Sequence, residues 1–249
     1  MPARESIFAK EAPLKIFQKC AETLKLNLSA IVHQGELLLS KQKSEAKAKK
    51  RHFILTDEHL YYTSKVVSSA SELEFDVKAK IHLPWVQTKF YSKKSENETH
   101  ERFYIFVARA NKSAVLQCAD IDEYEAWVIK LTRLTIQTNF AKKYKVEHKI
   151  GQGSSANVYE VTNMHNMCSY ACKQFKKSKL QSRDDYLRLV NEIQVLRAVR
   201  GTPNVIELEE VHETDGSIYV VTELCEGSKL GSEQVPSSLP ETLMLGYSV

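Results

Sequence analysis

Long apolar runs are missing from this sequence of 249 residues. No stretch of 18 or more apolar residues occurs, which excludes an ordinary membrane-spanning helix. The first residues, "MPARESIFAKEAPLKIF", include acidic residues where a signal peptide would have an apolar segment. Hydrophobic residues make up 43% of the chain and charged residues 27%, as in a typical globular protein. We therefore expect an intracellular, cytoplasmic protein.

Cysteine is too sparse for a disulfide framework. The five cysteines are odd in number, scattered, and contain no CxxC pair. The nearest two, Cys168 and Cys172, lack further Cys or His residues at zinc spacing. We expect reduced, mostly structural thiols and no metal site.

Charge is unevenly distributed along the chain. The whole chain has a net charge of +4, yet residues 41–51, "KQKSEAKAKKR", contain six basic residues and one acidic residue. The rest of the chain is close to neutral. This asymmetry predicts an anionic partner for the stretch rather than for the whole surface.

Glycine is almost absent from the first half. Only Gly35 of the eight glycines precedes Gly151, so the chain changes character near residue 140. We place a domain boundary at "QTNFAKK" and predict an α+β fold with two domains. The predicted parts are a helical extension (1–28), a first domain (29–137), a linker (138–143), a second domain (144–230) and a poorly ordered tail (231–249).

The first half begins with a predicted helix from Pro13, because proline suits the first helical position and apolar residues follow at helical spacing. This helix could lie on a membrane surface, but docking on the adjacent domain is favoured. The apolar residues are Leu14, Phe17, Ala21 and Leu24.

Seven β-type segments follow, separated by polar loops at the spacing of an all-β barrel or sandwich. A single helix closes this unit, with Asp120 as its N-cap and Glu123 three residues on. The strands are predicted at 35–40, 51–56, 59–64, 79–83, 85–92, 102–109 and 113–118, and the helix stripe comprises Tyr124, Trp127, Val128, Leu131 and Leu134.

Seven strands and a closing helix that carries Trp127 near its start resemble a pleckstrin homology (PH) domain. Phosphoinositide-binding PH domains carry a lysine that ends strand one, then a basic residue, a spacer and an arginine that enter strand two. Lys41, Lys49 and Arg51 stand in those places. Residues two apart on a strand share a face, so Lys49 and Arg51 would meet one anionic headgroup, with Lys50 on the other face.

Other interpretations of the basic stretch stay open. "KAKKR" (47–51) also fits a solvated hairpin loop or a nuclear-localisation match. Nucleic acid is not expected as a partner, because the run is short and no aromatic stacking platform interleaves it.

The second half opens with "IGQGSSANVYEV" (150–161), in which Gly151, Gly153 and Ala156 fit G-x-G-x-x-[G/A]. A Rossmann loop must run directly into a helix. Here the flanking segments "YKVEHKI" and "NVYEV" both have strand character. The glycines are therefore predicted at a hairpin tip, as in protein kinases.

The chain from residue 144 to about 230 resembles the upper lobe of a protein kinase, most closely serine/threonine kinases of the calcium/calmodulin-dependent type. The order of PH domain before kinase is similar to protein kinase B. The resemblance implies a five-stranded antiparallel sheet and one helix, 183–199, whose Glu192 pairs with Lys173 near the ATP phosphates. It also implies a hairpin at Asp215-Gly216. The implied ATP-binding residues are Ile150, Gly151, Gly153, Ser154, Val158, Ala171, Lys173, Glu192, Thr222, Glu223 and Cys225.

The sequence departs from a complete kinase in two ways. Ala156 replaces the third glycine, and neither H-R-D-x-x-x-x-N nor D-F-G occurs. We expect a truncated copy, from an early stop, a gene model or an alternative transcript. Alone it would bind ATP weakly and transfer no phosphate, and magnesium would need the missing lobe. The uncovered underside predicts marginal solubility or a protein partner.

Three functions compete on this basis. The chain is part of a serine/threonine kinase recruited to membranes by its PH domain, or a non-catalytic lipid-binding adaptor. The third alternative is a scaffold that binds neither lipid nor nucleotide.

Overall fold

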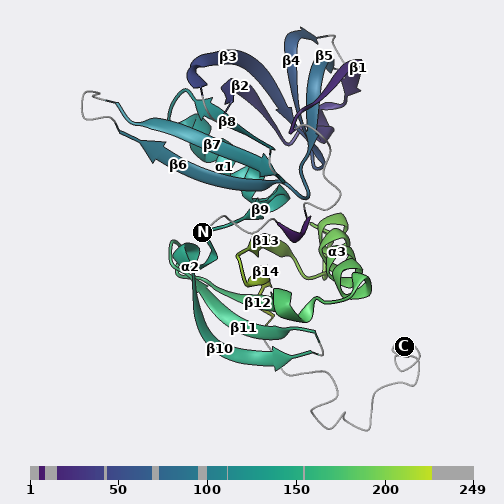
Figure 1. The fold of residues 1–249 in the computed structure, drawn as a ribbon. Helices are drawn as coiled ribbons and strands as arrows, with labels where there is room; N and C mark the ends of the chain where they lie inside the picture. Colours follow the sequence, from purple (N-terminus) through teal and green to yellow (C-terminus); the bar gives the residue numbers. More distant parts are fainter. Residues whose placement is uncertain are drawn as a thin grey trace.

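The computed structural model describes residues 6–8, 16–41, 44–68, 73–94, 100–110, 112–153 and 155–225. The protein is α+β and consists mostly of strands, as the sequence predicts. Two units follow one another along the chain and lie one above the other in Figure 1. Within the described residues, no helix is both long and apolar enough to cross a bilayer.

The first unit is an antiparallel sheet that curls around one core. In the order β5-β4-β3-β2-β8-β7-β6 each strand pairs with its neighbour, and α1 (Ile121–Leu134) closes the unit. The bounds are β2 His33–Lys41, β3 Ser44–Leu55, β4 His59–Ser68, β5 Leu73–His82, β6 Gln87–Lys93, β7 Arg102–Arg109 and β8 Lys112–Cys118.

Alternation of apolar and polar residues forms these strands, and a capped amphipathic segment forms α1. The Asp120 side chain accepts a hydrogen bond from the Glu123 amide, as predicted for the N-cap. Trp127 is fully buried at the centre of the core. A Cβ added to Gly35 would lie 3.1 Å from Glu123 Oε1 and 3.4 Å from Trp127 Nε1, so the one glycine of this half lets α1 approach β2.

The helix predicted in the N-terminal extension is wrong over β1 (Gln18–Leu26), which pairs antiparallel with β5. Leu24 and Leu26 lie on one side of this strand and pack against a cluster that includes Phe75. The open edge of β5 supplies backbone partners for most of the segment, with a break in register between Lys19 and Glu22, and such tertiary pairing outweighs a local helical pattern. A short 3₁₀ turn, Leu28–Ala30, leads into the barrel.

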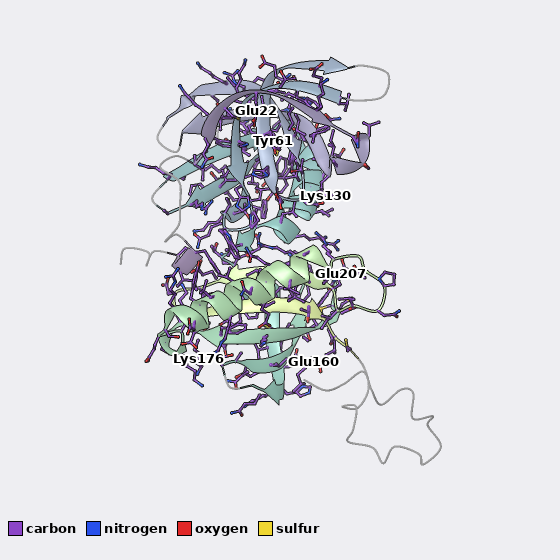
Figure 2. All side chains as sticks on the ribbon, turned by 90° about the vertical axis from the view of Figure 1, so that its right-hand side faces the viewer. Glu22, Tyr61, Lys130, Glu160, Lys176 and Glu207 are labelled. Atoms are coloured by element: carbon purple, nitrogen blue, oxygen red, sulfur yellow. The ribbon has the colours of Figure 1, made fainter. Side chains whose placement is uncertain are left out.

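The second unit is an antiparallel sheet in the order β13-β14-β12-β11-β10, with α3 (Arg183–Ala198) across one face. Figure 2 shows α3 in front of this sheet, directly beneath the first unit. Ser182 and Asp185 form a capping box that begins the helix. The remaining bounds are β10 Tyr144–Gln152, β11 Asn157–Asn163, β12 Ser169–Lys176, the 3₁₀ turn Lys177–Lys179, β13 Leu208–Glu213 and β14 Ser217–Glu223.

The two units are joined by hydrogen bonds rather than by a loose connection. β9 (Ile136–Gln137) pairs in parallel with β6 on one side and with β13 on the other, so one sheet runs through both units (Figure 1). The residues predicted as a linker contain the short helix α2 (Phe140–Lys143). Phe140 stacks on Tyr219 with ring centroids 3.8 Å apart.

A buried polar cluster supports the second unit close to this junction. His212 Nε2 lies 2.7 Å from Glu210 Oε2, and Lys143 forms an ion pair with the same carboxylate. Burial opposes ionisation of Glu210, but His212 and Lys143 together bring its pKa below the usual value. Burial also lowers the pKa of His212. Both shifts favour a neutral imidazole beside a charged carboxylate.

Candidate functional site

The glycine-rich segment forms the tip of the β10–β11 hairpin, as the sequence predicts. Gly151 pairs with Val158 across the hairpin, and the Gly153 amide donates to the Ala156 carbonyl at 2.8 Å. A Cβ added to Gly151 would lie 3.4 Å from the Val158 Cβ. Glycine thus leaves the backbone close to the neighbouring strand. Ser154, the fourth predicted residue of the loop, lies outside the described residues.

The strand register places the predicted ATP-binding residues of the strands on one face of the sheet. Val158 is opposite Lys173, Ala171 is opposite Thr222, and Lys173 is also opposite Val220. Cross-strand partners in an antiparallel sheet point the same way. All of these except Val220 are partly exposed, so the face remains accessible beyond α3. The other face is covered by a cluster of Phe140, Tyr144, Val161, Cys172 and Val221.

Lys173 and Glu192 form an ion pair on the accessible face. Lys173 Nζ lies 2.7 Å from Glu192 Oε1 and 2.8 Å from Oε2, with the two side chains 35% and 32% exposed. The pairing predicted from sequence is present, and α3 supplies the acid. The ammonium also lies 5.1 Å from the Phe175 ring centroid. Glu192 restrains the Lys173 ammonium above the accessible face of the sheet, where an anion can approach it.

The segment predicted as the hinge follows β14. Thr222 Oγ1 donates to the Glu223 carbonyl at 3.2 Å, while the Glu223 amide donates to the Glu207 carbonyl at 3.1 Å. The Glu223 N–H is therefore used within the protein. Cys225 is exposed, and so is Ile150 at the hairpin.

The basic residues of the first unit lie on β2 and β3. Lys49 is opposite Leu39 and Arg51 is opposite the buried Leu37, so the two cations share the face that turns toward the core. Lys49 is exposed and Arg51 is partly exposed, and the Arg51 guanidinium donates to the Lys50 carbonyl at 2.9 Å.

Two neighbouring lysines differ from this pair. Lys50 lies on the opposite face and forms an ion pair with Glu36 at 2.6 Å. Lys41 pairs with Ser44 in the backbone register, and its side chain is outside the described part of the chain. Among the described residues, no three His, Cys, Asp or Glu side chains are grouped so that they could hold a metal ion.

Two family models match the chain. Residues 31–135 match the PH domain, and residues 144–241 match the protein kinase domain. The chain carries a PH domain followed by a fragment of a protein kinase domain. We call the second unit the kinase lobe.

The kinase lobe is similar to calcium-dependent protein kinases of plants. It is 34% identical over 87 residues to calcium-dependent protein kinase 7 of Oryza sativa subsp. japonica (35% of this chain, 16% of the relative). It is 34% identical over 92 residues to calcium-dependent protein kinase SK5 of Glycine max (37% and 18%) and 34% over 87 residues to calcium-dependent protein kinase 4 of Arabidopsis thaliana (35% and 17%). The chain thus spans less than a fifth of the length of these curated relatives.

Some residues that shape the site escaped the sequence analysis. Trp85, predicted to begin a strand, lies in the turn between β5 and β6 of the PH domain, where the Arg197 guanidinium is 5.5 Å from its ring. Phe8 and Glu213 also contribute to the junction. Their contacts join residues more than 70 positions apart, so no local pattern announces them. The one signal available was the rarity of tryptophan, since the chain has only two.

Proposed function

We propose that the kinase lobe is the upper lobe of an ATP-dependent serine/threonine protein kinase, and that its accessible face binds ATP. The observation that carries this proposal is the Lys173–Glu192 ion pair below the glycine hairpin. Val158 and Ala171 would cover the adenine, and Lys173 would meet the α- and β-phosphates. The five strands and α3 would then be the kinase arrangement implied by the resemblance.

These residues fit a nucleotide chemically. The hairpin has glycines at two positions, the face beneath it carries small side chains, and one cation is partly exposed there. The Glu223 carbonyl and the Cys225 amide would meet the adenine edge, since the Glu223 N–H is already bonded. Phosphoryl transfer also needs an aspartate that orients the substrate hydroxyl and another that holds magnesium. The motifs that supply them do not occur in these 249 residues, so the polypeptide itself is proposed to bind ATP weakly without turnover.

Calorimetric titration of the 249-residue chain with ATP tests the site. We expect a Kd of about 1 mM or weaker, and binding at least about tenfold weaker for Lys173→Met. Lys176→Met is the matched control, because Lys176 is exposed on the same strand and has no place in the proposed site. Equal binding by wild type and Lys173→Met would contradict the proposal. So would ATP turnover that survives Lys173→Met.

We propose that the PH domain recruits the chain to anionic membranes through Lys49 and Arg51, with Lys41. Support comes from the register that places Lys49 and Arg51 on one face. Two cations on one face suit a phosphorylated headgroup, and their contribution should fall as salt is raised. The chain would then be peripheral and cytoplasmic, and the lobe could act as a lipid-dependent adaptor without catalysis.

Sedimentation with phosphoinositide-containing vesicles tests this second function. Arg51→Ala should reduce the bound fraction at least severalfold, whereas Lys50→Ala should leave it nearly unchanged because Lys50 lies on the opposite face with Glu36. If Lys50→Ala and Arg51→Ala reduce binding equally, the contact is a diffuse charge effect and the specific site is excluded. Vesicles of neutral lipid serve as the blank.

A further inference from the structure

The helix that supplies Glu192 is held at its first turn by a residue from the start of the chain. Phe8 is 1% exposed and stacks on Trp85 with ring centroids 4.9 Å apart and planes 15° apart. The Phe8 ring is also 6.3 Å from that of Tyr186 on α3. Phe8 belongs to the same buried cluster as Leu189 and Ile193 of this helix. Figure 1 shows this segment, residues 6–8 in dark purple, between the strands of the PH domain and α3.

The last turn of α3 is held by the PH domain. Arg197 Nη1 donates to the Pro84 carbonyl at 2.7 Å, and its guanidinium lies 5.5 Å from the Trp85 ring centroid. Arg197 Nε and Nη2 are buried and have no hydrogen-bond partner among the described residues. Burial lowers the pKa of Arg197 to about 10. The Pro84–Trp85 turn thus provides the described contacts that fix this buried cation.

One carboxylate contacts the N-terminal segment, the PH domain and the kinase lobe. Glu213, at the end of β13, has a side chain that is 2% exposed. It accepts hydrogen bonds from the Ile7 amide at 2.9 Å, from Gln87 Nε2 at 2.9 Å and from the Ser6 hydroxyl, and it pairs with Lys177 at 2.8 Å. The N-terminal segment, the PH strand β6 and the kinase lobe therefore depend on the same buried charge.

Only part of the helix is deeply buried. Leu189 and Ile193 are its fully buried side chains among the described residues, Val190 and Leu196 pack against the same cluster while partly exposed, and Leu187 and Val195 are exposed. Glu192 lies between the two held ends, at Tyr186 and Arg197. Because several of the packed side chains on α3 stay partly exposed, we expect the contacts at its two ends to contribute to the position of the helix.

We propose that Ser6, Ile7 and Phe8 together with the Pro84–Trp85 turn form an α3 clamp, whose members are positioning residues that hold Glu192 against Lys173. The PH domain and the start of the chain then decide whether the ion pair forms. The clamp would act on the helix and the ion pair whether or not this face of the sheet binds ATP. A negative charge at position 6 would face the Glu213 carboxylate and open the clamp.

Two measurements on the full 249-residue chain test the clamp. Hydrogen exchange of the α3 amides measures how readily the helix opens. A water-soluble carbodiimide, which joins an amine to a carboxylate with loss of water, reports the Lys173–Glu192 pair through the yield of the cross-linked peptide. For Phe8→Ala we expect at least tenfold faster exchange in α3 and at least threefold less cross-link, with α1 exchange unchanged. Phe8→Leu should restore most of the cross-link, because it keeps an apolar group in the same place.

Phe17→Ala is the matched control. Phe17 is also an N-terminal phenylalanine, but it packs on Phe53 and Tyr62 inside the PH domain. Its replacement should leave the cross-link yield at the wild-type level. Wild-type exchange and cross-link in Phe8→Ala would overturn the proposal, and so would equal losses in Phe8→Ala and Phe17→Ala.

A charge test remains decisive even if Phe8→Ala unfolds the lobe. Ser6→Asp and Ser6→Asn have nearly the same shape and differ in charge. Ser6→Asp should lower the cross-link yield several times more than Ser6→Asn, because only the carboxylate is repelled by Glu213. Equal yields in these two variants would overturn the role given to Glu213 in the clamp.

Discussion

The PH domain and the kinase lobe are both antiparallel sheets with one long helix, yet they bury that helix differently. In the PH domain, α1 places Trp127 and Leu131 into a single core made by its own strands. In the lobe, α3 covers only part of one face of the sheet, and the cluster under α3 is completed by Phe8 and Ile136 from outside the lobe. A unit that closes its own core can fold alone, whereas the other relies on its neighbour.

The largest expected effect comes from separating the two regions. Residues 16–137 should unfold in one cooperative urea transition, followed by circular dichroism, because the PH core is self-contained. Residues 138–249 should show a broad, weak transition or none, since they lose Phe8, Trp85 and β9. Equal cooperativity in the two fragments would break the comparison.

The two tryptophans provide the next comparison, because Trp127 lies in the PH core and Trp85 packs against the cluster under α3. Trp127→Ala should destabilise the chain by about 3–5 kcal/mol, because a fully buried aromatic ring leaves a cavity. Trp85→Ala should cost about 1–2 kcal/mol and act on the lobe alone, because its ring is only partly buried. Urea unfolding followed by circular dichroism measures each change. Larger destabilisation from Trp85→Ala would reverse the order.

Each region also contains one buried thiol. Burial raises the pKa of Cys118 in the PH domain and of Cys172 in the lobe to about 12, so both are unreactive unless their surroundings open. A short pulse of thiol reagent followed by mass spectrometry should label Cys172 at least about tenfold faster, equivalent to about 1.4 kcal/mol less opening free energy. The exposed Cys168 should react at once and calibrate the pulse. Faster labelling of Cys118 would contradict the comparison.

Acid should weaken both regions. Burial lowers the pKa of His212 in the lobe and of four histidines in the PH domain. The unfolded chain then takes up protons first, so the free energy of unfolding should fall as pH drops below about 6.5. The fall should come mainly from the fully buried His212, because solvent screens the four partly exposed histidines. His212→Gln should reduce the slope of the lobe alone, and an unchanged slope would exclude His212. The four in the PH domain are His33, His52, His59 and His82.

The smallest effect is expected at the proposed site itself. Lys173 and Glu192 are each about one third exposed, and a pair in that setting contributes little to stability. Lys173→Met should therefore change the free energy of unfolding by less than about 1 kcal/mol, measured by urea titration. A larger loss would show that the pair supports the lobe, in which case lost ATP binding in this variant would carry no weight.

Local sequence patterns predicted much of this fold. Alternating residues indicated the strands, Asp120 was predicted to begin the first helix, and the glycine pattern between two β-type runs indicated a hairpin. The Lys173–Glu192 pair followed from the ordered kinase-like motifs. The helix predicted before the barrel was wrong over Gln18–Leu26, because pairing with the open edge of β5 outweighs the helical spacing of the apolar residues. ATP and lipid binding stay predictions.

Residues close together in the sequence determined the hairpins, helix caps and alternating faces, because turn chemistry and side-chain periodicity act over a few positions. Tertiary structure alone decided that Gln18–Leu26 is a strand and that one sheet passes through β9 into both units. It also decided that Phe8 and Arg197 both contact Trp85 at the junction with α3. These outcomes depend on an open strand edge and a buried pocket. Both exist only after distant segments have come together.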